Sequence, residues 1–382
     1  MFSHRGRGDP PACQKKGMFA MKYKKLPALL LAMALLLSTL AACKPASETP
    51  SDDPSAEVSE DLPSQEPSAQ PDETPGLTGD QEPPIRLAVL SGPTGVGAAK
   101  LLDSVDNAPD SLRTFYSCTI AADNSELVAG LTNGEIDIAT VASNVAVNLY
   151  NKTDGGVQII ALGTLGVLHI LEGNGGTSIN SIADLAGRTI YCAGQGANPE
   201  YILRYLLRES GLEIGEDVEV VFADASEISA KLLSGEIECA MLPVPAATAA
   251  IIKGEGKVRA AIDVTEAWDA LETGSQVIMT AVVVRTDFAK TYPQKVSDFL
   301  ADYEASIDFV NNNVDAAAEL VAGYGITPSA AIAKQAIPQC HLAFISGADM
   351  MSSISSYFMA LYTVDPASVG GSLPDDGIYY VP

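Results

Sequence analysis

Histidine is scarce in this sequence of 382 residues, which contains three. Beyond the N-terminal segment only His169 and His341 remain, and His169 lies in an apolar run. A zinc site needs three or four protein ligands, and no second cluster accompanies the neighbouring Cys340 and His341. A Cys–His dyad needs side chains that face each other, which adjacent residues rarely do. The sequence therefore predicts no metal, no cofactor and no enzymatic activity.

Basic side chains are also few, since 23 Lys and Arg stand against 48 Asp and Glu, a formal net charge of −25. Residues 1–42 hold seven Lys or Arg and one Asp, so their removal would change the net charge to −31. Such an acidic surface repels the phosphates of nucleic acid. We therefore expect no nucleic-acid partner.

Two glycine-rich turns, 91–95 and 194–198, lack the residues of a phosphate-binding loop. Neither is followed by Gly-Lys-Ser/Thr, and neither has the G-x-G-x-x-G pattern of dinucleotide sites. Neither contains Lys or Arg, whereas a strongly charged ligand such as phosphate is often held by an arginine fork. These absences favour a singly charged or neutral organic ligand.

The N-terminal segment has the layout of a secretory signal peptide. Three lysines between residues 22 and 25 precede the apolar run Leu26–Leu37, which is shorter than the roughly 20 residues of a membrane span. Leu40-Ala41-Ala42-Cys43 follows and resembles the bacterial lipobox, whose cysteine receives the lipid. We predict a signal peptide over 1–42, with the true start at Met18 or Met21. Lipid on Cys43 would place the protein on the extracytoplasmic face of the cell membrane.

Residues 43–84 are rich in Pro, Ser, Glu, Asp, Ala and Thr. This composition buries too little apolar surface to offset chain entropy. It predicts a disordered, acidic tether between the lipidated cysteine and a folded domain. The alternative is an interaction tail, but the segment has no aromatic anchor.

The remaining 300 or so residues alternate between apolar strand-like runs and helical spacing, which predicts an α/β fold with largely parallel sheets. The segment 126–152 aligns without gaps on 227–253 at an offset of 101, with nine identities in 27 positions. Each copy predicts a helix, a glycine turn, a buried strand and a second helix. A unit repeated twice indicates two similar lobes, because a solenoid needs three or more repeats.

The chain is predicted to cross twice between the two lobes. Lobe 1 begins with 85–171, lobe 2 spans 172–274, and 275–382 returns to lobe 1 and adds C-terminal helices. Strands over 166–171 and 275–285 would cross between the lobes and form the hinge. Helices are expected over 292–310, 315–322, 330–336 and 348–362.

The cysteines Cys118, Cys192, Cys239 and Cys340 are expected to be buried free thiols, although spacing alone leaves a disulfide open.

Several stretches together resemble the substrate-binding proteins of ABC importers, in the branch with sulfonate-, taurine-, nitrate- and thiamine-precursor-binding members. They are Gly92-Pro93-Thr94-Gly95, 131–139, 182–190, 235–240 and 370–376. The resemblance covers about 85–380. It implies a two-lobed, periplasmic-binding-protein-like (type II) fold, a small organic or anionic solute between the lobes, a transporter permease as partner, and a monomer.

Ligands of open α/β sheets bind beyond the carboxyl ends of the strands. Glycine there allows close backbone approach, and helix N-termini offer free N–H groups that suit an anionic group. The residues predicted to line the cleft are Ser91, Gly92, Pro93, Thr94, Gly95, Ser143, Asn144, Gly194, Gln195, Gly196, Asn198 and Pro243. Each has a purely structural alternative; Asn198 and Pro199, for example, also make a good helix start. Tyr191, Tyr201 and Trp268 could stack on a ligand, but we predict that they are core residues.

Two other functions stay open at this stage. Fungal thiamine-pyrimidine synthase has the same fold and is an enzyme, but it depends on a Cys-rich iron motif that this sequence lacks. The second alternative is a surface lipoprotein with a purely structural role. Such a protein would need neither a glycine-lined cleft nor duplicated lobes.

The lipobox makes a direct prediction about Cys43. Cys43→Ser should release the protein into the medium or leave an uncleaved precursor, because the serine cannot take the thioether-linked lipid. Fractionation and immunoblotting of cells that express each form would show this. A Cys43→Ser variant that is still processed and still membrane-bound would refute the anchor.

Overall fold

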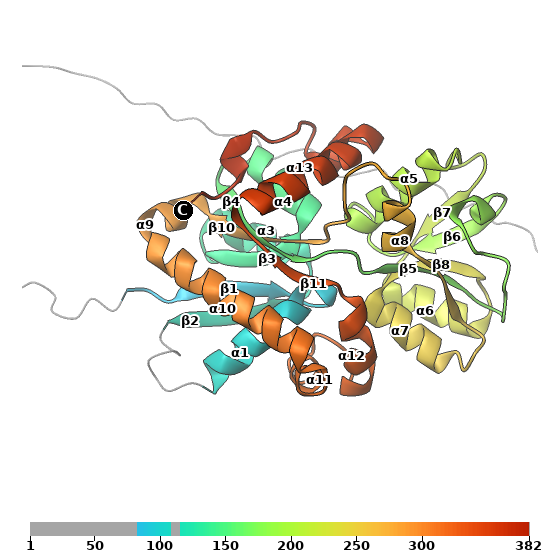
Figure 1. The fold of residues 1–382 in the computed structure, drawn as a ribbon, viewed down its shortest axis with the longest axis horizontal. Helices are drawn as coiled ribbons and strands as arrows, with labels where there is room; N and C mark the ends of the chain where they lie inside the picture. Colours follow the sequence, from blue (N-terminus) through green and yellow to red (C-terminus); the bar gives the residue numbers. More distant parts are fainter. Residues whose placement is uncertain (1–81, 108–114, 382) are drawn as a thin grey trace, which may run out of the picture. The chain divides into compact units, whose positions relative to one another are not determined.

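A computed structural model describes residues 82–107 and 115–381, and the predicted signal peptide, Cys43 and nearly all of the tether lie outside these ranges. The larger sheet has six strands in the order β11 (Leu342–Ile345), β4 (Val157–Thr164), β10 (Thr280–Arg285), β3 (Ile138–Ala142), β1 (Ile85–Leu90) and β2 (Tyr116–Ala121). The smaller sheet has five, in the order β7 (Glu219–Phe222), β6 (Thr189–Cys192), β8 (Cys239–Pro243), β5 (Leu168–Glu172) and β9 (Arg259–Asp263). We call the larger sheet with its helices lobe 1 and the smaller sheet with its helices lobe 2 (Figure 1).

Helices surround both sheets (Figure 1). Those of lobe 1 are η1 (Pro93–Ala98), α1 (Ala99–Asp106), α3 (Asn124–Asn133), α4 (Ser143–Lys152), α9 (Thr286–Thr291), α10 (Pro293–Asn312), α11 (Val314–Gly323), α12 (Ala330–Ala336), η3 (Ile337–Gln339), α13 (Gly347–Val364), η4 (Pro366–Val369) and η5 (Asp376–Ile378). Those of lobe 2 are η2 (Ile182–Leu185), α5 (Asn198–Glu209), α6 (Ala225–Ser234), α7 (Val244–Lys253) and α8 (Val264–Asp269). The four C-terminal helices predicted from the sequence correspond to α10, α11, α12 and α13. Within the described ranges, no helix is long and apolar enough to cross a membrane.

The duplication seen in the sequence is also a duplication of structure. The elements α3, β3 and α4 begin and end 101 residues before α6, β8 and α7. Gly134 and Gly235 close the first helix of each copy in the left-handed region, both with φ of 80°. A side chain is strained there, which explains why this glycine is kept in both copies.

The strand order repeats as well. In lobe 1 the parallel strands β2, β1 and β3 are followed by antiparallel β10, and in lobe 2 the parallel strands β7, β6 and β8 are followed by antiparallel β5. β10 and β5 are the strands by which the chain enters each sheet directly from the other lobe. The chain therefore crosses twice between two sheets of the same topology.

The return crossing is less regular than predicted. A strand was expected over 275–285, but β10 begins at Thr280. Just before β10, Met279 still donates its N–H to the Thr164 carbonyl of β4 at 3.0 Å. The Ile278 carbonyl, however, accepts from the Ser143 hydroxyl at 2.6 Å, and the Met279 carbonyl accepts from the Asn198 side-chain amide at 3.0 Å. These two carbonyls bond to the junction between the lobes, and the crossing before Thr280 is an extended connection.

A continuous apolar core joins the lobes on one side. Trp268 of α8 is fully buried, stacks on Tyr205 of α5 at 4.4 Å between ring centroids and lies 5.8 Å from Tyr357 of α13. The helices α5 and α13 also meet at the surface, where Arg208 donates to the Thr363 carbonyl at 2.7 Å. Trp268 and Tyr201 are thus core residues, as ranked from the sequence, and Tyr191 is half-buried with Lys231 over its ring.

The four cysteines of the described residues are free thiols, and Cys192, Cys239 and Cys340 are buried while Cys118 is half-buried. Cys118, Cys192 and Cys239 lie in strands, where each behaves as a small apolar side chain. No disulfide contributes to the described part of the fold.

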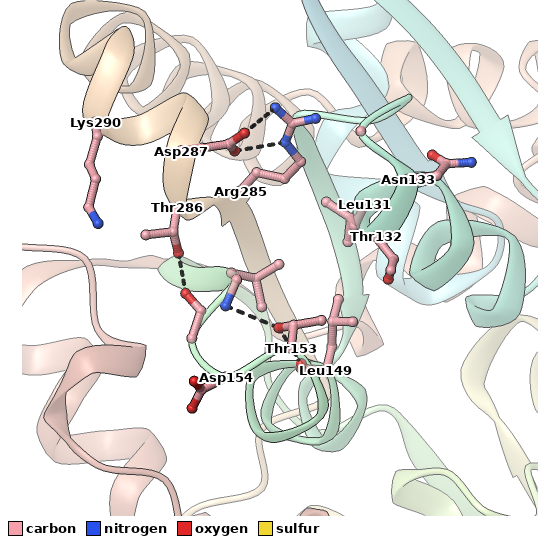
Figure 2. A pocket seen from close by; sticks show the side chains of 14 residues that line it. Leu131, Thr132, Asn133, Leu149, Thr153, Asp154, Arg285, Thr286, Asp287 and Lys290 are labelled. Atoms are coloured by element: carbon pink, nitrogen blue, oxygen red, sulfur yellow. Dashed lines mark hydrogen bonds and ion pairs between the residues drawn. The ribbon is translucent and has the colours of Figure 1, made fainter. Parts of the chain in front are cut away.

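A hollow of about 670 Å³ lies at the edge of lobe 1 where β10 ends and β4 begins. Two contacts join residues of its lining (Figure 2): Arg285 forms an ion pair with Asp287 at 2.9 Å, and the Thr286 hydroxyl donates to the Gly155 carbonyl at 2.6 Å. These contacts close the loop between α4 and β4 against the start of α9.

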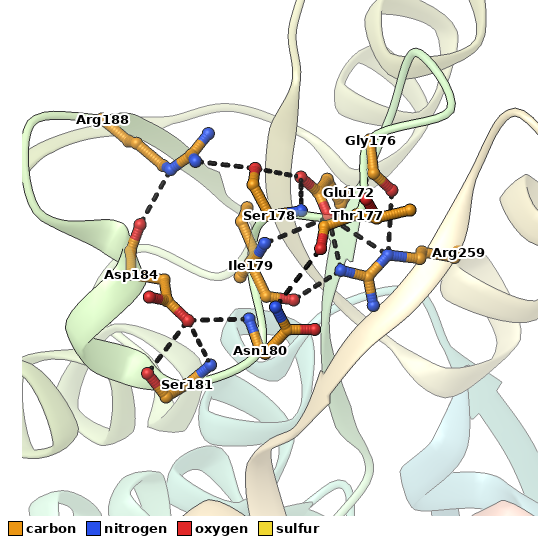
Figure 3. A network of polar contacts seen from close by, with 10 residues as sticks. All are labelled: Glu172, Gly176, Thr177, Ser178, Ile179, Asn180, Ser181, Asp184, Arg188 and Arg259. Carbon is orange, nitrogen blue, oxygen red and sulfur yellow. Dashed lines mark hydrogen bonds and ion pairs between the residues drawn. The ribbon is translucent and has the colours of Figure 1, made fainter.

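In lobe 2, the loop that follows β5 is closed by a buried carboxylate. Glu172, 3% exposed at the end of β5, accepts from the Ser178 amide at 3.0 Å and the Ser178 hydroxyl at 2.7 Å (Figure 3). Arg259 on β9 donates to the same carboxylate through Nε at 3.1 Å and also bonds the Gly176 carbonyl at 3.0 Å. Burial opposes the charge on Glu172, but these hydrogen bonds outweigh it and hold its pKa below the usual range.

Glu172→Gln should lower the free energy of unfolding by about 2–3 kcal/mol at pH 7, because it leaves the Arg259 guanidinium without a counter-charge. A lowered folded-state pKa contributes stability above the unfolded pKa, near 4.3, and this is lost as pH falls through the folded value. Urea unfolding at pH 7 and at pH 3 should therefore show the deficit shrinking in acid. Glu304→Gln, an exposed position of α10, is the control, and an equal effect of both substitutions would contradict the role of Glu172.

Candidate functional site

A cleft of about 430 Å³ lies between the two lobes, which is within the range of small-molecule sites. Lobe 1 contributes the turn after β1 and the loop before α12, and lobe 2 contributes one face each of α6 and α7. The lining residues are Gly92, Pro93, Pro328, Ala225, Ser226, Ser229, Ala230, Leu233, Pro243, Pro245, Ala246, Ala249 and Lys253. Most of them are small and apolar.

Three of the predicted residues, Gly92, Pro93 and Pro243, line this cleft. Gly92 has φ of 82° and precedes η1, whose first residue is Pro93. A Cβ at Gly92 would meet no atom within 4 Å, so the backbone conformation rather than space requires glycine. Pro243 ends β8 and precedes α7. Each therefore follows a parallel strand at its carboxyl end, as the sequence predicted.

The predicted polar residues Ser143, Asn144 and Asn198 are brought together, but they contact one another. All three are fully buried. Asn198 of lobe 2 donates to the Ser143 hydroxyl at 3.0 Å and accepts from the Asn144 backbone amide at 3.3 Å, and the Asn144 side chain donates to the Gly196 carbonyl at 3.3 Å. The Asn198 side chain thereby caps helix α4 of the other lobe. We call these three residues the interlobe tie.

The start of α5 is occupied by a carboxylate of its own helix. Gly196 donates its backbone N–H to Glu200 Oε2 at 2.8 Å, and Glu200 is 8% exposed and forms an ion pair with Arg204 at 2.6 Å. The sequence predicted free N–H groups here for an anionic ligand. In this structure the Gly196 N–H already has an anionic partner from the chain.

The other predicted residues surround the cleft without lining it. Ser91 donates to the Ala122 carbonyl at 3.5 Å, and Thr94 and Gly95 are buried inside η1. A Cβ at Gly95 would lie 2.3 Å from the Leu90 carbonyl oxygen, so its glycine serves packing. Gly194 has φ of 92°, and with Gln195 it lies on the exposed part of the turn.

No pattern in the sequence predicted the α6 face or Pro328 as part of the cleft. Ala225, Ser226, Ser229 and Ala230 recur at helical spacing, but a stripe of small residues is equally typical of ordinary helix packing. Pro328 lies 85 residues beyond Pro243, in the return to lobe 1. The packing of lobe 2 beside the return to lobe 1 brings these residues together.

Several buried polar atoms near the interlobe tie lack a hydrogen-bond partner among the described residues. They include Asn144 Oδ1 and the hydroxyls of Thr164 and Thr280. Thr164 and Thr280 are directly paired at the ends of β4 and β10, so their side chains share one face of the sheet. Buried polar groups are normally bonded, and these three are neutral groups that remain free to form hydrogen bonds.

Cys340 and His341 do not form a dyad. The His341 ring nitrogen Nδ1 lies 2.6 Å from the Gly166 carbonyl oxygen at the outgoing crossing. Burial raises the pKa of the Cys340 thiol to about 12, so the reactive thiolate is not formed near neutral pH. In the ranges 82–107 and 115–381, no group of three or more His, Cys, Asp and Glu side chains is placed to hold a metal ion.

The hollow of Figure 2 is larger than the cleft but contains none of the predicted site residues. It lies at the opposite end of β3 from the turn into α4, because Asn133 and Gly134 precede that strand. Ligands of open α/β sheets bind beyond the carboxyl ends. The cleft between the lobes is therefore the stronger candidate site.

Comparison with solved structures identifies the fold. A crystal structure of an ABC transporter protein from Parabacteroides distasonis is 23% identical, with a TM-score of 0.65 over 78% of this chain and 99% of that one. The periplasmic aliphatic sulphonate binding protein of Escherichia coli is 14% identical, with a TM-score of 0.64 over 79% and 93% of the two chains. A generic periplasmic-binding-protein fold is also described for a Candida albicans protein, 12% identical with a TM-score of 0.52 over 78% and 94% of the two chains.

These similarities confirm the predicted α/β periplasmic-binding-protein fold. No curated protein sequence matches the chain significantly. The family model described as NMT1/THI5 like matches residues 121–317, just over half of the chain. This range runs from the end of β2 into α11 and includes the interlobe tie and the α6 and α7 walls of the cleft. The chain therefore belongs to the NMT1/THI5-like family.

Proposed function

We propose that this protein is the solute-binding component of an ABC importer. The observation that carries the proposal is the cleft of about 430 Å³ between two lobes of the same topology that are joined by two crossings. The proteins of similar fold from Parabacteroides distasonis and Escherichia coli carry the names of an ABC transporter and of a sulphonate-binding protein. The partners are then a small-molecule ligand and a transporter permease.

The cleft has two walls, and each belongs to a different lobe. Gly92, Pro93 and Pro328 cover one side of a bound molecule, and α6 and α7 cover the other. A ligand in an open form would touch one wall, whereas in the closed form it touches both. Because a ligand shifts an equilibrium only by its differential affinity, this arrangement favours closure around the ligand.

The interlobe tie sets the closed position. Asn198 bonds to the start of α4 and to the Met279 carbonyl on the return crossing, so one side chain connects lobe 2 to both parts of lobe 1. In an open form the carboxamide of Asn198 and the hydroxyl of Ser143 would be exposed to the cleft. They can then bind a polar group of an entering solute before the lobes close.

We place the protein on the outer face of the membrane as a monomer, held by lipid on Cys43. The described domain begins at Glu82, about 40 residues beyond that cysteine. A tether of this length gives the domain room to meet a permease in the same membrane. This localisation has its own test in the Cys43→Ser variant.

Filling the cleft should abolish solute binding. Ala230 lines the cleft and is exposed on α6, so Ala230→Trp adds an indole to the site without disturbing the core. Thermal shift against sulfonates, nitrate, pyrimidines and aliphatic alcohols should find a solute that stabilises the wild type, by about 2.7 kcal/mol at a hundredfold excess over Kd. The shift should vanish in Ala230→Trp.

Ala301→Trp is the matched control, because Ala301 is an exposed alanine of α10 outside the cleft. Its thermal shift should equal that of the wild type. If no solute stabilises the wild type, or if Ala230→Trp retains the full shift, solute binding in this cleft is wrong.

Loss of the interlobe tie should favour the open form. Asn198→Ala removes the contacts to Ser143, Asn144 and Met279, which predicts an affinity loss of about 1–3 kcal/mol for any solute that needs closure. Small-angle scattering without ligand should show a larger radius of gyration than in the wild type. Asn312→Ala at the exposed end of α10 is the control, and identical scattering of all three proteins would show that the tie does not hold the lobes together.

A further inference from the structure

We propose that the outgoing crossing between β4 and β5 carries an acid-sensitive contact between the lobes, built from His169 and Asp263 of lobe 2 and His341 of lobe 1. We call these three residues the histidine latch. Acid loosens the latch and thereby favours the open form. The inference rests on the proposed closure of the two lobes, but it needs no assumption about the solute.

His169 lies in β5, directly after the outgoing crossing, and its side chain is 10% exposed. Its ring nitrogen Nδ1 is buried and has no hydrogen-bond partner among the described residues. The Asp263 carboxylate, opposite it on β9, lies 3.9 Å from this nitrogen. That distance is too long for a hydrogen bond, but a protonated ring would feel the charge of the carboxylate.

The Asp263 carboxylate is already held by the start of α8. Its Oδ1 atom accepts from the backbone N–H groups of Thr265 at 2.8 Å and Glu266 at 3.2 Å, and so caps the helix. A Cβ at Gly166 would lie 1.7 Å from the Thr265 hydroxyl oxygen, so the crossing passes directly against this helix start. A move of the carboxylate toward His169 would stretch both capping bonds.

Lobe 1 contacts the same crossing through His341. The ring nitrogen Nδ1 of His341 lies 2.6 Å from the Gly166 carbonyl oxygen, and the His341 carbonyl accepts from the Leu165 N–H at 3.2 Å. His341 has φ of 43°, a left-handed conformation that a side chain makes unfavourable, and these contacts hold it there. Gln339, also of lobe 1, faces the His169 ring. Separation of the lobes at this crossing therefore exposes His169 to water.

The surroundings of His169 oppose its protonation. Burial has the largest effect and lowers the pKa of His169 below its ordinary value of 6.5; the Asp263 carboxylate raises this pKa, and the His341 ring lowers it. Leu242, opposite on β8, is apolar, and the first turn of α7 holds no titratable group. Glu266 of α8 is exposed. The closed form therefore disfavours a charged ring that the open form accepts.

The direction of the pH effect follows from this lowered pKa. A ring with a lower pKa in the closed form binds fewer protons there than in water, so the closed form is fully stable above about pH 6.5 and loses stability as pH falls below it. One proton changes the ratio of open to closed form by at most about tenfold for each pH unit. Carboxylates with ordinary pKa values near 4 stay ionised between pH 7.5 and 5.5.

Amide hydrogen exchange of the purified protein at pH 7.5 and 5.5, corrected for the intrinsic pH dependence of exchange, measures this loss even when the open form is rare. Two amides report on it. The Leu165 N–H is bonded to His341 of the latch, and the Asn144 N–H is bonded to the Asn198 side chain of the other lobe. Each protection factor should fall by about threefold to tenfold at the lower pH.

Two matched variants identify the group that titrates. His169→Gln has a polar side chain that takes up no proton, so both protection factors should stay constant between the two pH values. His341→Gln keeps a donor for the Gly166 carbonyl and should retain the fall. NMR of the histidine rings in the wild type, assigned with these variants, should show His169 titrating below pH 6.5, and this result does not depend on how well His169→Gln folds.

The outcomes separate the latch from the proposed function. Constant protection factors in the wild type, a fall that persists in His169→Gln, or a His169 ring that titrates at or above pH 6.5 overturns the latch. A fall at Leu165 without one at Asn144 overturns the link between the latch and the opening of the lobes. Solute binding in the cleft is judged independently, by the thermal shift of the wild type and of Ala230→Trp at pH 7.5.

Discussion

The carboxamide of Asn198 is the contact on which the arrangement of the two lobes depends. It is fully buried, and a buried amide is costly unless its donors and acceptor are bonded. Its partners are Ser143 and the backbone of Asn144 in lobe 1, and the Met279 carbonyl on the return crossing. The amide is thus satisfied by groups of lobe 1 and of the return crossing, so this one side chain contacts both.

The duplication explains both the likeness and the difference of the lobes. The two copies share helix boundaries, left-handed glycines and a terminal lysine, all of which serve the folding of one βα unit. They differ at the start of the second helix, where Ser143 and Asn144 correspond to Val244 and Pro245. One lobe therefore brings hydrogen-bonding groups to the junction and the other brings an apolar wall. Equal scaffolds with unequal first turns therefore place hydrogen-bonding groups of lobe 1 in the interlobe tie and apolar groups of lobe 2 at the cleft.

The sequence predicted what local pattern controls. The repeat at an offset of 101 predicted both copies of the helix–strand–helix unit. The glycine turn after the first strand predicted Gly92 and Pro93 at the cleft, and the loop after the second repeated strand predicted Pro243. It could not predict the partners of Asn198, because Ser143 and Asn144 lie more than 50 residues away and the contact depends on how the lobes close. The sequence did not predict Ala230 as a cleft residue for a related reason. A small residue on a helix gives the same sequence pattern whether it faces a neighbouring element or a cavity.

The stacking of Trp268 gives the protein an intrinsic optical signal. It is the single tryptophan of the chain, and its indole is enclosed between Tyr205 of lobe 2 and Tyr357 of lobe 1. Any separation of α8 from α13 changes the polarity around that one indole. Its emission wavelength and quantum yield therefore report the distance between the lobes with no added dye, and stopped-flow fluorescence can follow each closing event as it happens.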